Sequence, residues 1–243
     1  MTKVLKIILL MLIIGIGLFI WNKSSKKDDA NFITYEVNFK NDKVKLYWKN
    51  DSNHILKSIS NLKTFTDSKN ESLVFATNAG MYKIDNSPQG LFIQNGILIN
   101  DTDTTKGTGN FYLTPNGVFY INKDESAFIK TTANFKMNND IEYATQSGPM
   151  LIIENEINSI FNKKSTNLNI RNGVGITADK KVIFAMSKTA ISFYDFANYF
   201  KTMGCTNALY LDGFVSRTYL PEKNWMQIDG NFGVMVGVTR KEK

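Results

Sequence analysis

From Phe32 to the C-terminus, short apolar runs alternate with turn-forming residues, and this pattern restricts the chain to a β-rich fold. Asn95-Gly96 is a strong hairpin dipeptide between two apolar runs, and Asn116-Gly117 repeats the arrangement. We predict hairpins over Gly90–Asn100, Phe111–Asn122, Met150–Ile160, Gly173–Met186 and Thr34–Trp48. Two continuous apolar runs, Leu73–Thr77 and Ala208–Leu211, indicate central strands buried on both faces.

Helices are fewer than strands. The clearest covers Ser192–Met203, where Ser192 and Asp195 form a capping-box pattern and Gly204 follows the last turn. The spacing of Ile55, Leu56, Ile59 and Leu62 indicates a second helix near residues 53–63. The sequence therefore predicts an α+β fold: a mixed, hairpin-rich β-sheet with a few packed helices, preceded by one N-terminal hydrophobic helix.

The N-terminal residues 1–21 are predicted to be a membrane anchor or signal segment. Ile7–Trp21 contains no charged residue, and the apolar stretch extends back to Val4 with only Lys6 inside it. Phe19-Ile20-Trp21 lacks the small residues of a cleavage site, which favours an uncleaved anchor through residues 4–21. Residues 22–31 are a polar linker, and 32–243 form the domain. We expect an extracytoplasmic, membrane-anchored protein of a bacterial envelope, secreted if the segment is cleaved.

Composition excludes several classes of protein. The chain has one Cys and one His among 243 residues, so a disulfide framework and a zinc site with several Cys or His ligands are excluded. The net charge is +7, of which residues 1–30 contribute +3 from five Lys and two Asp. The remaining excess is small and shows no basic cluster with interleaved aromatic residues, so nucleic acid is not an expected partner. Oligomeric state is not readable from the sequence.

Polar residues gather in four segments at the ends of predicted strands, where a rigid scaffold presents functional groups. The segments are 77–82, 144–149, 170–175 and 209–216. Each is also compatible with ordinary turn chemistry. Gly173 and Gly175 allow close backbone approach by a ligand. Asp212, which emerges from a buried strand, needs partners or a function because burying an unpaired carboxylate is costly.

Seven short motifs occur in order along the chain, and together they carry a resemblance to a known family. They are Asn-Ala-Gly-Met-Tyr at 78–82, Ser-Pro-Gln-Gly-Leu at 87–91, Gly-Asn-Phe at 109–111, Gln-Ser-Gly-Pro-Met at 146–150, Arg-Asn-Gly-Val-Gly at 171–175, Asn-Ala-Leu-Tyr-Leu-Asp-Gly at 207–213 and Gly-Val-Met-Val-Gly-Val at 233–238. Over residues 34–240 the chain resembles the phosphodiester glycosidase family, which includes the enzyme that uncovers mannose 6-phosphate by removing N-acetylglucosamine. It is most similar to short bacterial members that are exported or anchored.

The resemblance implies hydrolysis of a sugar–phosphate diester at the anomeric carbon. Asp212 is the expected base, nucleophile or oxocarbenium stabiliser, and the guanidinium of Arg171 suits a phosphate. Asn78 completes the expected catalytic set. The residues expected to bind substrate are Gly80, Gln146, Ser147, Asn172, Gly213, Ser216 and Arg217. No cofactor is expected, although Asp and Asn at strand ends leave a Ca²⁺ or Mg²⁺ ion open.

Two departures from the family pattern keep a second reading open. Phe214 and Val215 stand where members often carry a small or hydroxyl residue, and Asp212 is the only carboxylate with a convincing position. Asp85 and Asp101 are better explained as loop residues, so a two-carboxylate mechanism has no support. The alternative function is a non-catalytic phosphoglycan-binding or cell-surface interaction module on the same fold.

Overall fold

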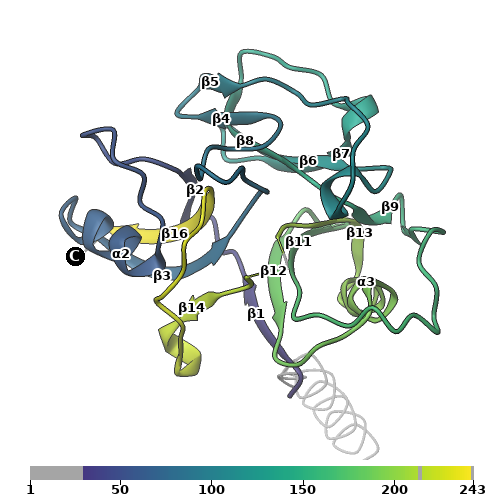
Figure 1. Ribbon diagram of the computed structural model, residues 1–243. Coiled ribbons are helices and arrows are strands. Elements are labelled where there is room, and N and C mark those ends of the chain that lie inside the picture. Colours follow the sequence, from purple (N-terminus) through teal and green to yellow (C-terminus); the bar gives the residue numbers. More distant parts are fainter. Residues whose placement is uncertain (1–29, 213–214, 242–243) are drawn as a thin grey trace, which may run out of the picture. The chain divides into compact units, whose positions relative to one another are not determined.

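The computed structural model describes residues 30–212 and 215–241, and in this part the chain forms three antiparallel sheets and two α-helices (Figure 1). The β-rich fold with packed helices is confirmed, but the predicted mixed sheet is wrong. Every pair of neighbouring strands in the described ranges runs antiparallel, because hairpins and returning loops connect them. The predicted N-terminal helix and nearly all of the predicted linker lie outside the described residues.

The α3 sheet has six strands and is covered by helix α3 (Phe193–Thr202). Their order is β1 (Phe32–Glu36), β12 (Val182–Ser187), β11 (Asn172–Thr177), β13 (Cys205–Tyr210), β9 (Met150–Ile153) and β10 (Glu156–Ile157). The helix begins as predicted, since Ser192 Oγ accepts from Asp195 N and donates to the Asp195 carboxylate. A Cβ on Gly173 or Gly175 would meet Phe200 of the helix, so these glycines admit the helix rather than a ligand.

The α2 sheet has five strands and carries helix α2 (Ile59–Asp67). Their order is β15 (Trp225–Met226), β14 (Thr218–Leu220), β3 (Glu71–Asn78), β16 (Met235–Lys241) and β2 (Lys43–Tyr47). Helix α2 starts several residues later than predicted, because Lys57 has a left-handed φ of 63° and Ser58 caps the first turn. The run Leu73–Thr77 lies inside the central strand β3, as predicted.

The third sheet, here called the hairpin sheet, has five strands. Their order is β5 (Ile97–Asn100), β4 (Phe92–Gln94), β8 (Ile141–Ser147), β6 (Gly117–Asn122) and β7 (Ala127–Thr131). The hairpin at Asn95-Gly96 is confirmed, as are the hairpins over Met150–Ile160 and Gly173–Met186. The main core lies between the three sheets, and its members include Phe75, Phe119 and Phe184.

Two predicted hairpins are wrong. Residues Asn110–Tyr112 form a short 3₁₀ turn, and Gly117 opens strand β6, which pairs with β7 across a turn that Asp124 closes by accepting from Ser126. Strands β1 and β2 do exist, but they belong to different sheets, since β1 pairs with β12 and β2 pairs with β16. In the described residues, no helix combines the length and apolar character needed to cross a membrane.

Asp42, in the link between β1 and β2, connects the sheets to which these strands belong. Its side chain is fully buried, and its carboxylate accepts from Tyr35 Oη at 2.6 Å, Asn38 N at 2.8 Å and Arg240 Nε at 2.8 Å. Tyr35 lies in the α3 sheet and Arg240 in the α2 sheet. The buried carboxylate therefore joins the two sheets at this end.

We predict that Asp42→Ala lowers the free energy of unfolding by about 1–3 kcal/mol, because it leaves the buried Tyr35 phenol without its acceptor and removes the partner of the partly exposed Arg240. Asp179→Ala is the matched control, since that carboxylate is 64% exposed and pairs with Lys181 at the surface. The control should change stability by less than about 1 kcal/mol. Urea unfolding of both variants checks the prediction, and equal losses would contradict it.

Candidate functional site

Three strand ends from two sheets meet at one place. Strand β3 ends at Asn78, β13 ends at Tyr210, and the antiparallel neighbour β11 begins at Asn172, opposite that end. Asp212 follows β13 by two residues, and Leu211 N donates to Asn172 O at 3.1 Å. The motifs that the sequence places at 78–82, 171–175 and 207–213 are thus brought together, although more than 90 residues separate the first two.

Two buried asparagines hold this junction. Asn172 Nδ2 donates to Asn78 O at 2.6 Å and to Thr77 Oγ1 at 3.0 Å, while its Oδ1 accepts from Asp212 N at 3.2 Å. Asn78 Nδ2 donates to Asp212 O at 2.9 Å, and its Oδ1 accepts from Arg217 N at 2.9 Å. Neither side chain is more than 1% exposed. Both main-chain groups of Asp212 are therefore fixed, one by each sheet.

Two buried hydroxyl groups support the same segment. Ser216 Oγ lies 3.2 Å from the main-chain oxygens of Asp212 and Ile170, and Ser147 Oγ donates to Leu211 O at 2.6 Å. Their hydroxyls thus act on the backbone around Asp212. This placement supports a structural contribution, and binding of substrate by Ser147 or Ser216 stays a prediction.

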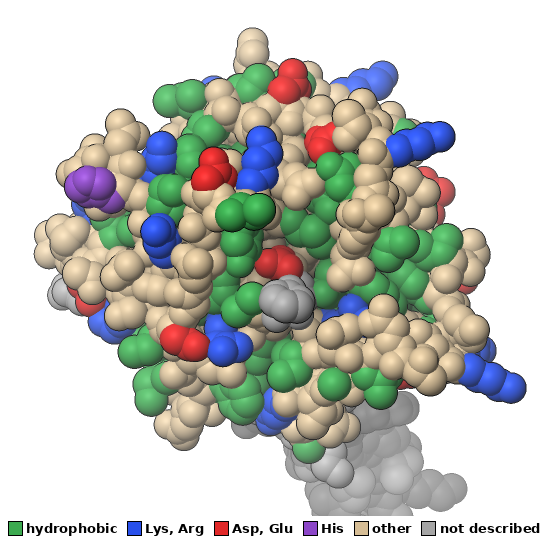
Figure 2. All heavy atoms as spheres, viewed as in Figure 1, with side chains coloured by type: hydrophobic (Ala, Val, Ile, Leu, Met, Phe, Trp, Pro, Cys, Tyr) green, Lys and Arg blue, Asp and Glu red, His purple; other side chains and the backbone are tan. Residues whose placement is uncertain are grey.

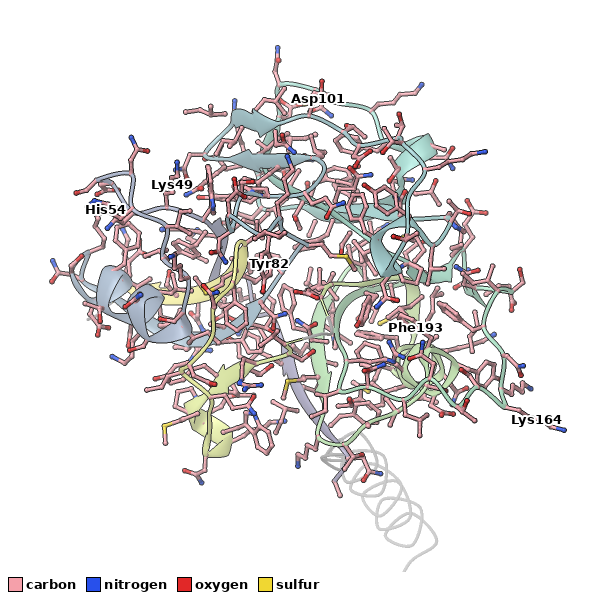
Figure 3. The ribbon with its side chains drawn as sticks, viewed as in Figure 1. Lys49, His54, Tyr82, Asp101, Lys164 and Phe193 are labelled. Atoms are coloured by element: carbon pink, nitrogen blue, oxygen red, sulfur yellow. The ribbon has the colours of Figure 1, made fainter. Side chains whose placement is uncertain are left out.

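The charge of Asp212, a partly buried residue, acts on two tyrosines. Burial raises the pKa of Tyr82 to about 12, and the negative charge of Asp212 adds to the rise. The pKa of Tyr210 is also raised, chiefly by burial; the charge of Asp212 raises it further, and that of Arg171 opposes the rise. Both phenols are therefore neutral hydrogen-bond donors at physiological pH. Figure 3 labels Tyr82, and Figure 2 shows an acidic side chain in the recessed centre of the same face.

Arg171 lies in the protein interior. Its side chain is fully buried, Nε donates to Ile191 O at 2.9 Å, and Nη2 donates to Asn167 O at 3.0 Å. The guanidinium carbon stacks 3.6 Å from the ring centroid of Phe193, the first residue of α3. Burial lowers the pKa of Arg171, and the neighbouring Tyr210 works against that effect. The predicted contact with phosphate is untested, and the enclosed position gives this guanidinium no open path to solvent.

Gln146 and Gly80 position loops that neighbour the site. Gln146 Oε1 accepts from Leu91 N at 3.0 Å and Asp103 N at 2.9 Å, and its Nε2 donates to Asp103 O at 2.7 Å. A Cβ on Gly80 would clash with Thr145 Oγ1, so glycine lets the loop after β3 approach β8. The amide of Gln146 is thus bonded to these loops, and Gly80 contributes only its backbone. Gly213, the remaining predicted contact, lies outside the described residues, as does Phe214.

Arg217 is the arginine of this region that reaches the surface. Its Nε lies 2.8 Å and 3.0 Å from the two carboxylate oxygens of Asp229, and Nη1 donates to Ser216 O at 3.1 Å. Its side chain is 32% exposed, in contrast to the fully buried Arg171. The Arg217 guanidinium is therefore held in place by Asp229 while part of it faces solvent.

Sequence reasoning missed Tyr82 and Tyr210 as parts of the site. Tyr82 is the last residue of the motif at 78–82, and Tyr210 precedes Asp212 by two positions. This closeness in sequence was the available signal for Tyr210. Within the described ranges, no group of three or more His, Cys, Asp or Glu side chains is placed to hold a metal ion.

We predict that Asn172→Ala lowers the free energy of unfolding by about 1–3 kcal/mol, because it strands buried polar groups of Thr77, Asn78 and Asp212. Asn139→Ala, at an exposed position, should leave stability within about 0.5 kcal/mol of the parent. Chemical unfolding of the two variants gives the comparison. A loss at Asn172 no larger than at Asn139 would show that the junction does not depend on this amide.

The chain is similar to proteins of one family. Residues 71–238 match the family model described as phosphodiester glycosidase. The uncharacterized protein YigE of Escherichia coli is 34% identical over 210 residues, which are 85% of this chain and 81% of YigE.

Solved structures share the fold at low sequence identity. The catalytic domain of zebrafish N-acetylglucosamine-1-phosphodiester alpha-N-acetylglucosaminidase superposes with a TM-score of 0.58 at 14% identity, covering 91% of this chain and 85% of that one. A predicted exported protein of Burkholderia pseudomallei gives 0.55 at 8% identity, covering 85% and 73%. These likenesses concern the fold alone. The family match spans the three strand ends that surround Asp212, and the chain belongs to the phosphodiester glycosidase family.

Proposed function

We propose that this protein hydrolyses a sugar-1-phosphodiester, with Asp212 as the carboxylate at the anomeric carbon. The observation that carries the proposal is the fixed position of Asp212. Asn78 and Asn172 hold its main chain from two sheets, and its charge acts on two neutral phenols. A carboxylate on a main chain held in this way has its backbone position set before substrate arrives, which favours stabilisation of a developing positive charge.

The chemistry needs little beyond this arrangement. Water adds to the anomeric carbon, the bond from that carbon to the phosphate oxygen breaks, and a sugar and a phosphate monoester are released. Because the phosphate monoester is a good leaving group, a strong general acid is less necessary than in most glycosidases. The phenol of the partly buried Tyr82 supplies a neutral donor for a sugar hydroxyl or a phosphate oxygen. Asp212 acts as base, nucleophile or oxocarbenium stabiliser, and the anomer released first distinguishes retention from inversion.

Arg217 is the cation that we assign to the phosphate. Its guanidinium is oriented by Asp229 and partly exposed, so it can pair with a phosphate oxygen without leaving a buried position. Its main-chain N donates a hydrogen bond to Asn78 Oδ1, so Arg217 is held by the same junction as Asp212. The cation suits the negative phosphate, and the carboxylate suits the positive charge that develops at the anomeric carbon.

The proposed setting is extracytoplasmic, with an envelope phosphoglycan as substrate. The apolar stretch at 4–21 and the exported relative from Burkholderia pseudomallei support this setting. Membrane anchoring through that stretch is part of the proposal, as is the absence of a required cofactor.

We predict that Asp212→Asn abolishes turnover, with a loss of at least about 10³-fold in kcat/KM and little change in melting temperature. The assay follows free reducing sugar from UDP-N-acetylglucosamine and a panel of sugar-1-phosphodiesters. Asp179→Asn, a surface carboxylate after β11, is the matched control and should keep full activity. Full activity of Asp212→Asn would contradict the assignment. The activity of the parent protein should persist in EDTA.

A folded protein that releases no sugar from any compound would point to the alternative, a binding module. Melting temperature with the same panel then separates the two cases. A rise with a sugar-1-phosphodiester but without product indicates binding alone. No rise and no product would remove the proposed substrate class.

We predict that Arg217→Ala raises KM about 10- to 100-fold while changing kcat less, because it removes a charge-assisted contact to the phosphate in the bound ground state. Lys201→Ala, which removes an exposed cation from the end of α3, serves as the control. Steady-state kinetics on the best substrate of the panel measure both. An unchanged KM for Arg217→Ala would move the phosphate contact elsewhere.

A further inference from the structure

Arg171 is a buried cation, and the predicted contact with phosphate does not explain its enclosed position. Its side chain is fully buried and, within the described residues, it forms no ion pair. Burying a charge without a partner charge is expensive, so such a residue needs a compensating function. Two hydrogen bonds fix the guanidinium. One goes to Ile191 O in the loop before α3, and the other to Asn167 O in the loop before β11.

The guanidinium is also enclosed by two aromatic rings. Phe193 lies 3.6 Å from Cζ of Arg171, and the ring of Tyr210 lies 5.6 Å from it. The two rings contact each other edge to face at a centroid distance of 4.8 Å. Arg171 Nη1 is buried and has no hydrogen-bond partner in the described ranges. The guanidinium therefore packs against the rings of Phe193 and Tyr210.

Tyr210 connects this cation with the reacting carboxylate. Tyr210 is the last residue of β13, lies two positions before Asp212 and is itself fully buried. Besides the effect of burial, the pKa of its phenol responds to both charges: the cation of Arg171 lowers it, and the anion of Asp212 raises it. Both charges therefore act on one phenol.

We infer that Arg171 is a positioning residue that holds the Tyr210 phenol beside Asp212, and that it makes no contact with the phosphate of the substrate. This inference rests on the proposed function, because it assigns a part in that reaction. It differs from the role that the sequence suggests for Arg171, and it leaves phosphate binding to Arg217. The phenol is the group through which the buried charge reaches the site.

The kinetic test compares Arg171→Met, Tyr210→Phe and the double variant in the full chain. Each single change should lower kcat about 10- to 100-fold and leave KM within about twofold, as expected when a residue that orients a reacting group is lost. The double variant should be no slower than the slower single variant, because both act through one phenol. A KM raised tenfold or more by Arg171→Met, or additive losses in the double variant, would overturn the inference in favour of direct phosphate contact.

Controls separate this effect from damage to the fold. Lys163→Met removes a cation that lies 5.1 Å from the ring of Tyr194 on the outer side of α3, so it matches the chemistry of the change away from the site. It should leave kcat unchanged. Arg171→Lys keeps the charge but not the planar fork, and should recover part of the lost kcat. Melting temperatures and circular dichroism report folding of every variant.

A second readout does not depend on turnover. With tyrosine labelled by ¹³C at Cζ, the resonance of Tyr210 is identified by its loss in Tyr210→Phe. Arg171→Met should move this resonance, while Lys163→Met should not. If no substrate is hydrolysed but the resonance moves, the proposed function fails and the contact between Arg171 and Tyr210 stands. An unmoved Tyr210 resonance would overturn the positioning role whatever the activity.

Discussion

The pair of buried asparagines, Asn78 and Asn172, is the interaction on which the rest of the site depends. Each side-chain amide forms hydrogen bonds through both its oxygen and its nitrogen, and the two asparagines come from different sheets. An amide suits this junction because it offers a donor and an acceptor without a charge, so it bridges two strand ends whose backbone groups would otherwise be buried unpaired. Aspartate at either position would satisfy only the accepting part of this pattern, and leucine would satisfy none of it.

Buried charges are treated in two different ways in this domain. Asp42 and Arg240 compensate each other directly and join two sheets at a distance from the site. Arg171 has backbone carbonyls and aromatic faces for partners in place of a carboxylate. The first arrangement resembles an ordinary structural ion pair. The second leaves an uncompensated positive potential beside Tyr210 and Asp212, where a reaction on an anionic substrate can use it.

Local features of the fold could be predicted from the sequence, because turns and caps depend on neighbouring residues. Asn95-Gly96 forms its hairpin, and Ser192 caps α3. The separation of β1 from β2 could not be predicted, since each strand pairs with a partner far along the chain, β1 with β12 and β2 with β16. The glycines of β11 suggested an approaching ligand, whereas the approaching group is the aromatic side of α3.

The same limit applies to the site. Its motifs could be located, and Asn78, Asn172, Ser216 and the main chain of Asp212 do come together. Which side chain faces the carboxylate and which supports the backbone depends on three-dimensional packing. Judged from the sequence, the polar groups of Arg171 and Gln146 suit a substrate equally well. In the structure, both side chains form hydrogen bonds within the protein.

The position of β16 sets a condition on when this site can exist. Although it contains the last residues of the described chain, it lies between β3 and β2, and its Met235 is paired with Asn78. A chain still being synthesised therefore lacks the strand that flanks Asn78 until residues 235–241 have been made. The Asp212 carboxylate thus acquires its complete surroundings only after β16 has joined the sheet.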